Sequence, residues 1–218
     1  MRPVTRRQAN RYAERSAATQ ALVMSALERL LDSGENYSEI SVQQILEEAG
    51  VSRATFYAHF HGKSAVLVRL TNDLRDSLVS LAETLDIADE GDGDVRLSVF
   101  FEEVIRIHRT RRSVIAAVAE AASYEASVSD FYTVNLESFE GAALRALLKG
   151  QALGTTTSDL DAVSASRIIA WGGAQAIAHH IRVEEAGCDP VFARELARIW
   201  WYGAYRRPEA RSSVQGAD

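Results

Sequence analysis

Apolar residues recur at helical spacing along most of this chain, beginning with a first predicted helix at residues 11–32. Four of them follow the i, i+3, i+4, i+7 rule for one buried face: Val23, Ala26, Leu27 and Leu30. Ser33 and Gly34 then provide a stop signal. The pattern predicts an amphipathic helix that packs on the next helices of the chain.

Two short helices are predicted next, and each has its own start signal. The first begins after Ser41, with Gln44 three residues later in the pattern of a capping box, and stops at Gly50. The second begins after Ser52, a favourable N-cap residue. Two short helices joined by a tight turn at residues 49–52 have the pattern of a helix-turn-helix.

A longer fourth helix is predicted at residues 63–85, where a leucine-rich stripe continues beyond the first three helices and connects a small head to a larger body. The Asp- and Gly-rich stretch at residues 87–94 predicts a loop. Further helices are predicted at residues 95–110, 113–124, 128–149, 160–185 and 191–205, with breaks at residues 150–158 and 187–190. We therefore expect an all-α protein of about nine helices.

The predicted domains follow from this pattern. Residues 1–75 form a three-helix helix-turn-helix domain, of which residues 1–10 are a flexible basic arm. Residues 76–207 form a C-terminal helical domain, and residues 208–218, which are small and polar, form a disordered tail.

Composition favours an ordinary soluble globular protein, because 47% of the 218 residues are hydrophobic and 25% are charged. The single cysteine, Cys188, cannot form an internal disulfide, which favours a reducing cytoplasm. No apolar run approaches the ~20 residues of a membrane span, so we expect no membrane partner. The arginine-rich start is superficially similar to an organelle transit peptide, but the apolar face of that helix is needed to close the small domain.

Charge is unevenly distributed along the chain. The net charge is -6, yet the first fifteen residues are rich in arginine, whereas residues 76–218 hold 14 basic and 22 acidic side chains. A basic head on an acidic body favours a partner of negative charge at the head. The terminal arginines are interpreted either as an arm toward a DNA groove or as a solvated, mobile segment.

An enzyme is not expected, because no catalytic spacing is found among the acidic residues, histidines and Cys188. His179 and His180 are adjacent, so on a helix they point ~100° apart and cannot easily share a metal ion. We expect no catalytic residue, no metal and no cofactor.

Burial of Phe56 and Phe60 in the third helix would turn a set of polar and small side chains outward. Arg53 can bind guanine or phosphate, and Thr55 can offer a hydroxyl or a methyl group to a base. Lys63 begins a helix whose dipole repels it, and an external phosphate would remove that conflict, although a merely solvated lysine is the alternative. The predicted DNA-binding residues are Ser41, Gln43, Ser52, Arg53, Ala54, Thr55, Tyr57, His59 and Lys63.

The same region carries a family resemblance. ISVQQI at residues 40–45, AGVSRATFYAHF at residues 49–60 and GKS at residues 62–64 closely resemble the DNA-binding domain of the TetR family of repressors. The motif resemblance covers residues 15–75, and over the remainder it rests on helix count and length. VFFE at residues 99–102 and the late Ile-Trp pair resemble the branch of ethionamide-type repressors, whose body helices enclose a long apolar ligand channel.

A second domain is expected for two reasons. One short recognition helix reads only a few base pairs, so a homodimer on a palindromic double-stranded operator is expected. The last two long helices are the expected interface because one of them carries small residues, with ordinary intrachain packing as the alternative. These small residues are Ala162, Ala165, Gly172, Gly173 and Ala176.

Aromatic residues gather in the body, beyond what a plain helical bundle needs, which favours a pocket for a largely apolar small molecule. Trp171, Gln175 and His179 are spaced four apart and offer an apolar wall with two polar handles, although for each of them taken alone a core position is the favoured reading. The loosely matching positions of the asparagines that hold ligands in ethionamide-type repressors are Ala170 and Gly173. The predicted ligand-binding residues are Phe100, Phe101, Val104, Trp171, Gln175, His179 and Trp200.

Together these observations predict a DNA-binding transcriptional regulator, a repressor released from its operator by a small apolar effector. The resemblance implies that the effector tilts the helix at residues 63–85 and changes the separation of two recognition helices. A ~100-fold preference for the non-binding state supplies about 2.7 kcal/mol. Control by a protein partner, and activation in place of repression, remain the alternatives.

Overall fold

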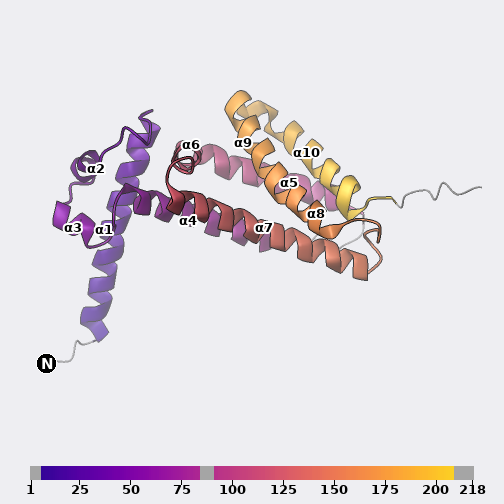
Figure 1. Cartoon of the computed structure of the whole chain (residues 1–218), viewed down its shortest axis with the longest axis horizontal. Helices are drawn as coiled ribbons and strands as arrows, with labels where there is room; N and C mark the ends of the chain where they lie inside the picture. The colour runs from indigo at the N-terminus through magenta and orange to yellow at the C-terminus, as the bar shows by residue number, and fades with distance from the viewer. Residues whose placement is uncertain (1–5, 84–90, 209–218) are drawn as a thin grey trace, which may run out of the picture. The chain divides into compact units, whose positions relative to one another are not determined.

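The computed structural model describes residues 6–83 and 91–208. Over these residues the chain folds into helices and contains no strand, which confirms the predicted all-α class (Figure 1). Parts of four predictions lie outside the described residues: residues 1–5 of the basic arm, residues 84–85 of the helix predicted at residues 63–85, residues 87–90 of the loop and residues 209–218 of the tail.

The helix order is close to the one that the sequence predicts. The elements are α1 (Arg6–Asp32), α2 (Val42–Ala49), α3 (Arg53–Tyr57), α4 (Lys63–Glu83), α5 (Gly93–Thr110), α6 (Arg112–Ala121), α7 (Ala126–Ala152), α8 (Ala162–Arg167), η1 (Ile168–Gly172), α9 (Gly173–Val183), η2 (Ala186–Cys188), α10 (Asp189–Trp200) and η3 (Trp201–Tyr205). Two of these, η1 and η3, are π-helical turns, and η2 is a 3-10 turn. If α8, η1 and α9 are counted as one continuous helix and α10 and η3 as another, the described residues form nine helices.

Contacts divide the chain into two compact units. The first unit comprises residues 1–76 and 111–133, and the second comprises residues 77–110 and 134–218. Residues 111–133, which the sequence-based division assigned to the second domain, therefore group with the first unit by their contacts. The functional domain boundaries themselves stay a prediction.

The core of the first unit combines the helix-turn-helix with α6. The apolar face of α1 meets α2, α3 and α4, and α6 adds small apolar side chains at helical spacing. Fully or nearly fully buried members of this core are Val23, Leu27, Ile45, Phe56, Val66, Leu67, Val114, Ala117, Val118 and Ala121. The predicted inward faces of the first and third helices are confirmed.

Local capping signals set the ends of the short helices as predicted. The Gln44 amide N–H donates to Ser41 Oγ at 3.2 Å, and the Ser41 amide N–H donates to Gln44 Oε1 at 2.8 Å, which closes a capping box. Gly50 ends α2 with a φ of 64°, a left-handed conformation that a side chain would strain. Ser52 Oγ accepts the Thr55 amide N–H at 3.1 Å and begins α3.

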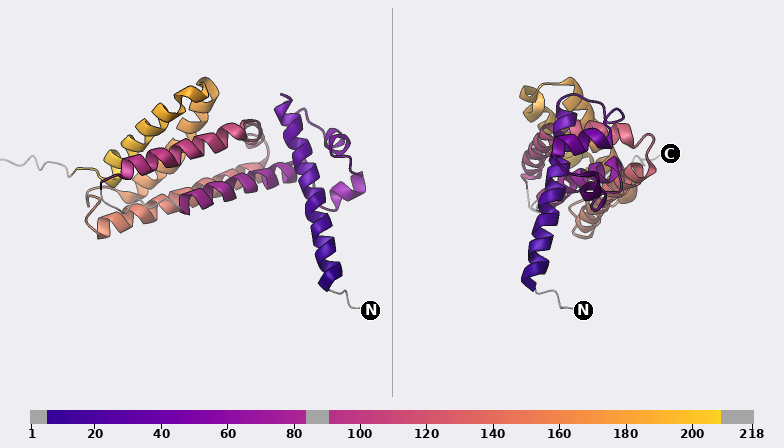
Figure 2. Two further views of the ribbon diagram at one scale, coloured as in Figure 1. Left: turned by 180° about the vertical axis from the view of Figure 1, so that it is seen from behind. Right: turned by 90° about the vertical axis from the view of Figure 1, so that its left-hand side faces the viewer.

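In the second unit the long helices lie lengthwise beside one another, and α10 runs antiparallel to α5 (Figures 1 and 2). The start of α10 meets the end of α5, where Asp189 pairs with Arg109 at 2.7 Å. The end of α10 meets the start of α5, where Trp201 packs over Gly93. A Cβ on Gly93 would lie 2.6 Å from Trp201 Cζ2, so glycine is required for this close approach.

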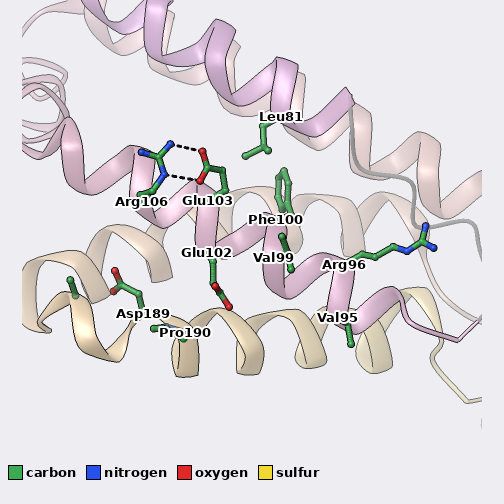
Figure 3. Close-up of a pocket in the computed structure, with 11 residues that line it drawn as sticks. Leu81, Val95, Arg96, Val99, Phe100, Glu102, Glu103, Arg106, Asp189 and Pro190 are labelled. Carbon is green, nitrogen blue, oxygen red and sulfur yellow. Dashed lines mark hydrogen bonds and ion pairs between the residues drawn. The ribbon is translucent and has the colours of Figure 1, made fainter.

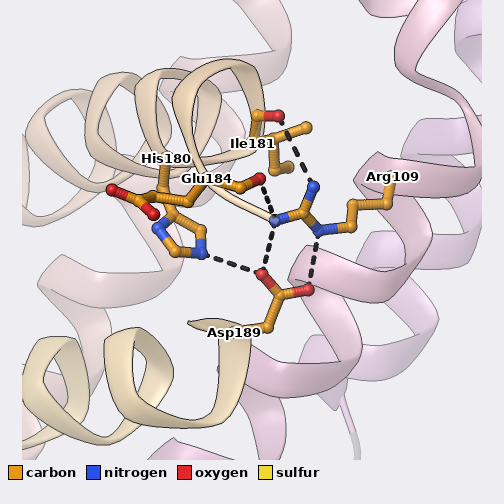
Figure 4. A network of polar contacts seen from close by, with 5 residues as sticks. All are labelled: Arg109, His180, Ile181, Glu184 and Asp189. Atoms are coloured by element: carbon orange, nitrogen blue, oxygen red, sulfur yellow. Dashed lines mark hydrogen bonds and ion pairs between the residues drawn. The ribbon is translucent and has the colours of Figure 1, made fainter. Parts of the chain in front are cut away.

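A polar network joins α5, α9 and α10 (Figure 4). Arg109 donates to both carboxylate oxygens of Asp189, from Nε and Nη2, at 2.7 Å each. His180 Nε2 lies 2.8 Å from Asp189 Oδ1, and its ring stacks on Phe192 with centroids 4.0 Å apart. Arg109 Nη2 also donates to the Glu184 carbonyl at 2.9 Å, which caps the end of α9. The hydrogen bonds from Arg109 hold the pKa of the Asp189 carboxyl below its usual range.

Candidate functional site

Side chains of α3 face outward on one side of the helix-turn-helix. Arg53, Ala54 and Tyr57 are exposed, while Phe56 on the opposite side is completely buried and Phe60 just beyond the helix is nearly so. The Tyr57 ring contacts Phe56 edge-on, with ring centroids 5.3 Å apart, which holds the phenol at the surface. The structure thus presents an arginine, a methyl group and a phenol on one short helix.

Polar residues at the starts of α2 and α3 serve local structure and also lie at the surface. Ser41 and Gln43 are exposed, and Gln43 Nε2 donates to Glu47 Oε1 at 2.7 Å. The Ser52 and Thr55 hydroxyls lie 2.8 Å apart, so the Thr55 hydroxyl is already engaged within the helix. His59 is half-buried, with Nδ1 3.4 Å from Ser16 Oγ, and links the end of α3 to α1.

Lys63 is held by main-chain carbonyl groups. Its Nζ donates to the carbonyl oxygens of Tyr37, Ser38 and Ile40 at 2.7, 3.2 and 2.8 Å, and it lies 4.5 Å from the centre of the Tyr37 ring. Burial lowers the pKa of this lysine, and the nearby Glu125 and Glu120 oppose that effect. The conflict with the helix dipole is therefore offset inside the protein, and the solvated lysine is not what the structure shows. A phosphate contact by Lys63 stays a prediction that requires at least one of these bonds to be exchanged.

Glu120 of α6 is a residue of this region that the sequence pattern did not indicate. Its carboxylate accepts the amide N–H groups of Tyr37 and Ser38 at 3.1 and 2.9 Å, and these hydrogen bonds lower its pKa. Lys63 binds carbonyl groups of the same segment, which lies just before α2. The segment is therefore held by two opposite charges: the ammonium group binds its carbonyls and the carboxylate binds its amide N–H groups. Residues 37 and 120 are 83 positions apart, and no local signal links them.

An apolar cavity of about 260 Å³ lies within the second unit. Residues of α4, α5, α7, η1, α9, α10 and η3 contribute to its wall: Leu78, Ala82, Leu97, Phe100, Phe101, Val104, His108, Leu136, Phe139, Ala142, Ala143, Ala146, Ile169, Ala170, Gly173, Ala174, Ile177, Trp200 and Tyr205. Four predicted ligand-binding residues are among them, namely Phe100, Phe101, Val104 and Trp200.

The other predicted wall, formed by Trp171, Gln175 and His179, is not part of this cavity. The cavity side of that helix is formed by Ile169, Gly173 and Ile177, which are offset by two residues and therefore lie ~200° around the helix axis. Gln175 and His179 are exposed, and the Trp171 indole N–H donates to Glu140 Oε2 at 2.9 Å on the outer side. These three residues therefore lie on a different side of the helix from the one that lines the cavity, and a role for them in ligand binding stays a prediction.

Gly173 shapes the cavity wall by admitting the Trp200 indole. A Cβ on Gly173 would lie 2.8 Å from Trp200 Cη2, closer than real contacts of this kind. Trp200 also packs edge-on against Phe101, with centroids 4.6 Å apart. Gly173 and Ala162 are buried within the chain. These two small residues therefore pack inside the chain, which was the alternative to a dimer contact.

A wider groove of about 770 Å³ lies on the outer side of α5 (Figure 3). Its wall combines apolar side chains with charged ones, among them Glu103 and Arg106, which pair with each other across one turn. Phe100 lines both this groove and the apolar cavity, and it is the shared wall between them.

Across residues 6–83 and 91–208, the structure contains no helix long and apolar enough to cross a membrane. The described residues also bring together no group of three histidine, cysteine or acidic side chains suited to a metal ion.

Comparison with known sequences points to one family. The profile of "Bacterial regulatory proteins, tetR family" matches residues 29–70. The HTH-type transcriptional regulator EthR of Mycolicibacterium smegmatis is 40% identical over 55 residues, which is 25% of each chain. EthR of Mycobacterium tuberculosis is 32% identical over 139 residues, covering 57% of this chain. The matches span a quarter and 64%, respectively, of these two curated relatives.

Solved structures share the fold over most of the chain. NalD, the secondary repressor of the MexAB-OprM multidrug efflux pump in Pseudomonas aeruginosa, superposes with a TM-score of 0.67 at 19% identity, covering 88% of this chain and 99% of that one. SmeT, the repressor of the Stenotrophomonas maltophilia multidrug efflux pump SmeDEF, gives 0.65 at 15% identity, covering 92% and 98%. The matched motif, the similarity to EthR and the shared fold together support a transcriptional regulator of the TetR family.

Proposed function

We propose that this protein is a DNA-binding transcriptional repressor that leaves its operator when a small, largely apolar effector binds. The observation that carries the proposal is α3, which buries Phe56 and presents Arg53, Ala54 and Tyr57 to solvent. A short helix with one face buried and an arginine free at its first turn suits insertion in the major groove.

The side chains divide into two roles. Arg53, Ala54 and Thr55 meet base edges, because an arginine can bind guanine with two hydrogen bonds and small side chains contact the thymine methyl. Tyr57 donates to phosphate, and polar groups at the starts of α2, α3 and α4 and at the end of α3 position the DNA backbone. The residues proposed for backbone contact are Ser41, Gln43, Ser52, Tyr57, His59 and Lys63.

A homodimer is part of the proposal, because five residues of α3 read too little DNA to select a site. Exposed apolar residues on the last two helices support an interface there: Ile168 is 71% exposed and Ile199 is 66% exposed. Gln175 and His179 lie on the same exposed helix as Ile168, so we assign them to this interface and not to the effector.

Sedimentation of variants tests the interface. Ile168→Glu and Ile199→Glu are expected to convert the dimer to a monomer, because each buries a charge at the contact. Val99→Glu, at a residue of 63% exposure on α5, is the matched control and should remain dimeric. A dimer that survives both isoleucine substitutions would contradict this interface.

Effector control is proposed to act through α4. This continuous helix supplies Lys63 to the first unit and Leu78 and Ala82 to the cavity wall. A ligand that moves Leu78 and Ala82 therefore acts on a helix that also carries residues of the helix-turn-helix domain. To release DNA the effector must prefer the non-binding state, and a ~100-fold preference corresponds to about 2.7 kcal/mol.

Selection of genomic DNA fragments by the purified full chain tests the function. We expect a few fragments to be enriched at physiological salt and to show a two-fold symmetric footprint. Arg53→Ala should abolish the enrichment, whereas Arg112→Ala, an exposed arginine of the same unit on α6, should leave it intact. Enrichment that is absent, or unchanged by Arg53→Ala, would refute the proposal.

A further inference from the structure

The cavity wall carries polar atoms at a few positions and no charged side chain. Of its residues only His108, Trp200 and Tyr205 have polar side-chain atoms. Burial lowers the pKa of His108, so the imidazole is neutral at pH 7. An ionised ligand would lose its hydration here and find no opposite charge among the lining residues. The wall therefore favours an uncharged ligand.

His108 presents a hydrogen-bond acceptor. Its Nδ1 lies 2.8 Å from the Val104 carbonyl oxygen, and because a carbonyl can only accept, Nδ1 carries the proton. In the neutral ring Nε2 is then an acceptor. Within the described part of the chain Nε2 has no hydrogen-bond partner. A ligand hydroxyl or amide N–H would satisfy it.

Tyr205 offers a second polar group. The residue is only 9% exposed, and its carbonyl accepts the Thr156 hydroxyl at 2.9 Å, which fixes the main chain. No partner of the phenol hydroxyl is found in residues 6–83 and 91–208. Burial raises the pKa of Tyr205 to about 12, so the hydroxyl remains a donor at neutral pH. A ligand that enters the cavity can pair with this hydroxyl.

These two groups lie toward opposite ends of the cavity. His108 is near the end of α5, where α10 begins, whereas Tyr205 lies in η3, which follows α10 and contacts α5. The eleven helical steps from Leu97 to His108 along the wall span about 16 Å of α5. Both π-helical turns, η1 and η3, supply wall residues, and such turns are frequent at binding sites.

Resting on the proposed function, we propose that the cavity selects an elongated, uncharged molecule with an apolar middle, a hydrogen-bond donor at the His108 end and a second polar group at the Tyr205 end. A staggered chain of twelve carbons extends about 15 Å, which is close to the length of α5 along the cavity wall. Carboxylates and ammonium compounds of the same length are excluded by the uncharged wall.

Probes of one length that differ only at their ends test this selection: dodecane-1,12-diol, 1-dodecanol and dodecanoate. Binding to the full chain is measured by calorimetry and by tryptophan fluorescence, to which Trp200 in the cavity wall contributes. The diol should bind about tenfold more tightly than the monoalcohol, because the monoalcohol lacks one hydroxyl and leaves the polar group of either His108 or Tyr205 unpaired in the complex. Dodecanoate should bind at least about 100-fold more weakly than the diol.

Variants assign the preference to the two residues. His108→Phe and Tyr205→Phe should each bring the diol and 1-dodecanol to equal affinity, whereas Tyr202→Phe, at an exposed tyrosine of η3, should leave the tenfold ratio intact. Tyr205→Phe removes a single oxygen, so it tests the ratio even if His108→Phe does not fold. Equal binding of dodecanoate and the diol, an unchanged ratio in both cavity variants, or binding of none of the probes overturns the proposal.

DNA binding is measured in parallel so that the two proposals fail separately. If the probes show the expected ratios but DNA is neither bound nor released, the ligand class is supported and the repressor function fails. If DNA is bound selectively and the probes show no discrimination, the function is supported and the ligand class is overturned.

Discussion

Replacement of Asp189 by asparagine would test the network that ties α5, α9 and α10 together. The carboxylate accepts two hydrogen bonds from Arg109 at 2.7 Å each and pairs with His180 at 2.8 Å. The side chains of Arg109 and Asp189 are only 19% and 15% exposed. Asparagine keeps the shape and one acceptor oxygen but removes the charge, so Arg109 loses its ion pair without loss of packing.

The expected cost follows from burial and from the partners that remain. Loss of one partner from a fully buried ion pair costs about 3–5 kcal/mol, because the other charge stays unpaired. Arg109 keeps some contact with water and its bond to the Glu184 carbonyl at 2.9 Å, which reduces this cost. We expect a loss of about 2–3 kcal/mol in the free energy of unfolding of the second unit.

Urea denaturation at one protein concentration measures this loss. All three tryptophans of the chain, Trp171, Trp200 and Trp201, belong to the second unit, so tryptophan fluorescence reports its unfolding selectively. The matched control is Glu103→Gln, which removes the exposed ion pair with Arg106 on the same helix and should change little. A loss below about 0.5 kcal/mol in the Asp189 variant, or an equal loss in the control, would refute the reasoning.

Three further predictions concern the same elements. The pKa of Asp189 is depressed in the folded protein, so the stability that its carboxylate contributes is present above about pH 4 and is lost as the pH falls through the folded pKa. The difference in free energy of unfolding between wild type and Asp189→Asn should therefore shrink in urea titrations at acid pH, and a constant difference would contradict the ion pair. Gly173→Ala should push Trp200 into the cavity and weaken probe binding, while Gly172→Ala, whose added Cβ meets only ordinary contacts, should not; calorimetry that gives equal affinities would disprove the role of Gly173. Phe56→Ala should lower the free energy of unfolding of the first unit by about 3–5 kcal/mol, as followed by circular dichroism. A loss below about 1 kcal/mol would mean that the ring is not the centre of that core.

The helix-turn-helix was predictable from sequence because its signals are local. Ser41, Gln44, Gly50 and Ser52 lie within one turn of the helix end that each of them sets, and the structure gives each the predicted capping role. Phe56 and Phe60 are four residues apart, so their shared inward face was also fixed by spacing.

The internal contacts of Lys63 and Glu120 were not predictable in this way. Their partners at residues 37–40 lie more than twenty positions away from Lys63 and more than eighty from Glu120. Sequence periodicity indicates which side of a helix is buried, but it does not indicate which distant main-chain groups a charged side chain will meet.

The lining of the apolar cavity was predicted only in part, for a similar reason. Spacing identified Trp171, Gln175 and His179 as one helix face but could not decide whether that face meets the cavity or the surface. The π-helical turn η1 at Ile168–Gly172 adds to the difficulty, because it shifts the helical phase before Gly173 relative to the residues after it. The cavity residues of α5 were found because Phe100, Phe101 and Val104 lie on the apolar side of a regular helix.

The most direct test of the account is the specificity ratio of the Arg53→Lys variant, measured by fluorescence anisotropy as affinity for a selected site over affinity for random DNA. Lysine keeps the charge but not the paired donors of arginine, so the ratio should fall about tenfold or more while binding to random DNA is retained. An unchanged ratio would show that the outward face of α3 does not read bases.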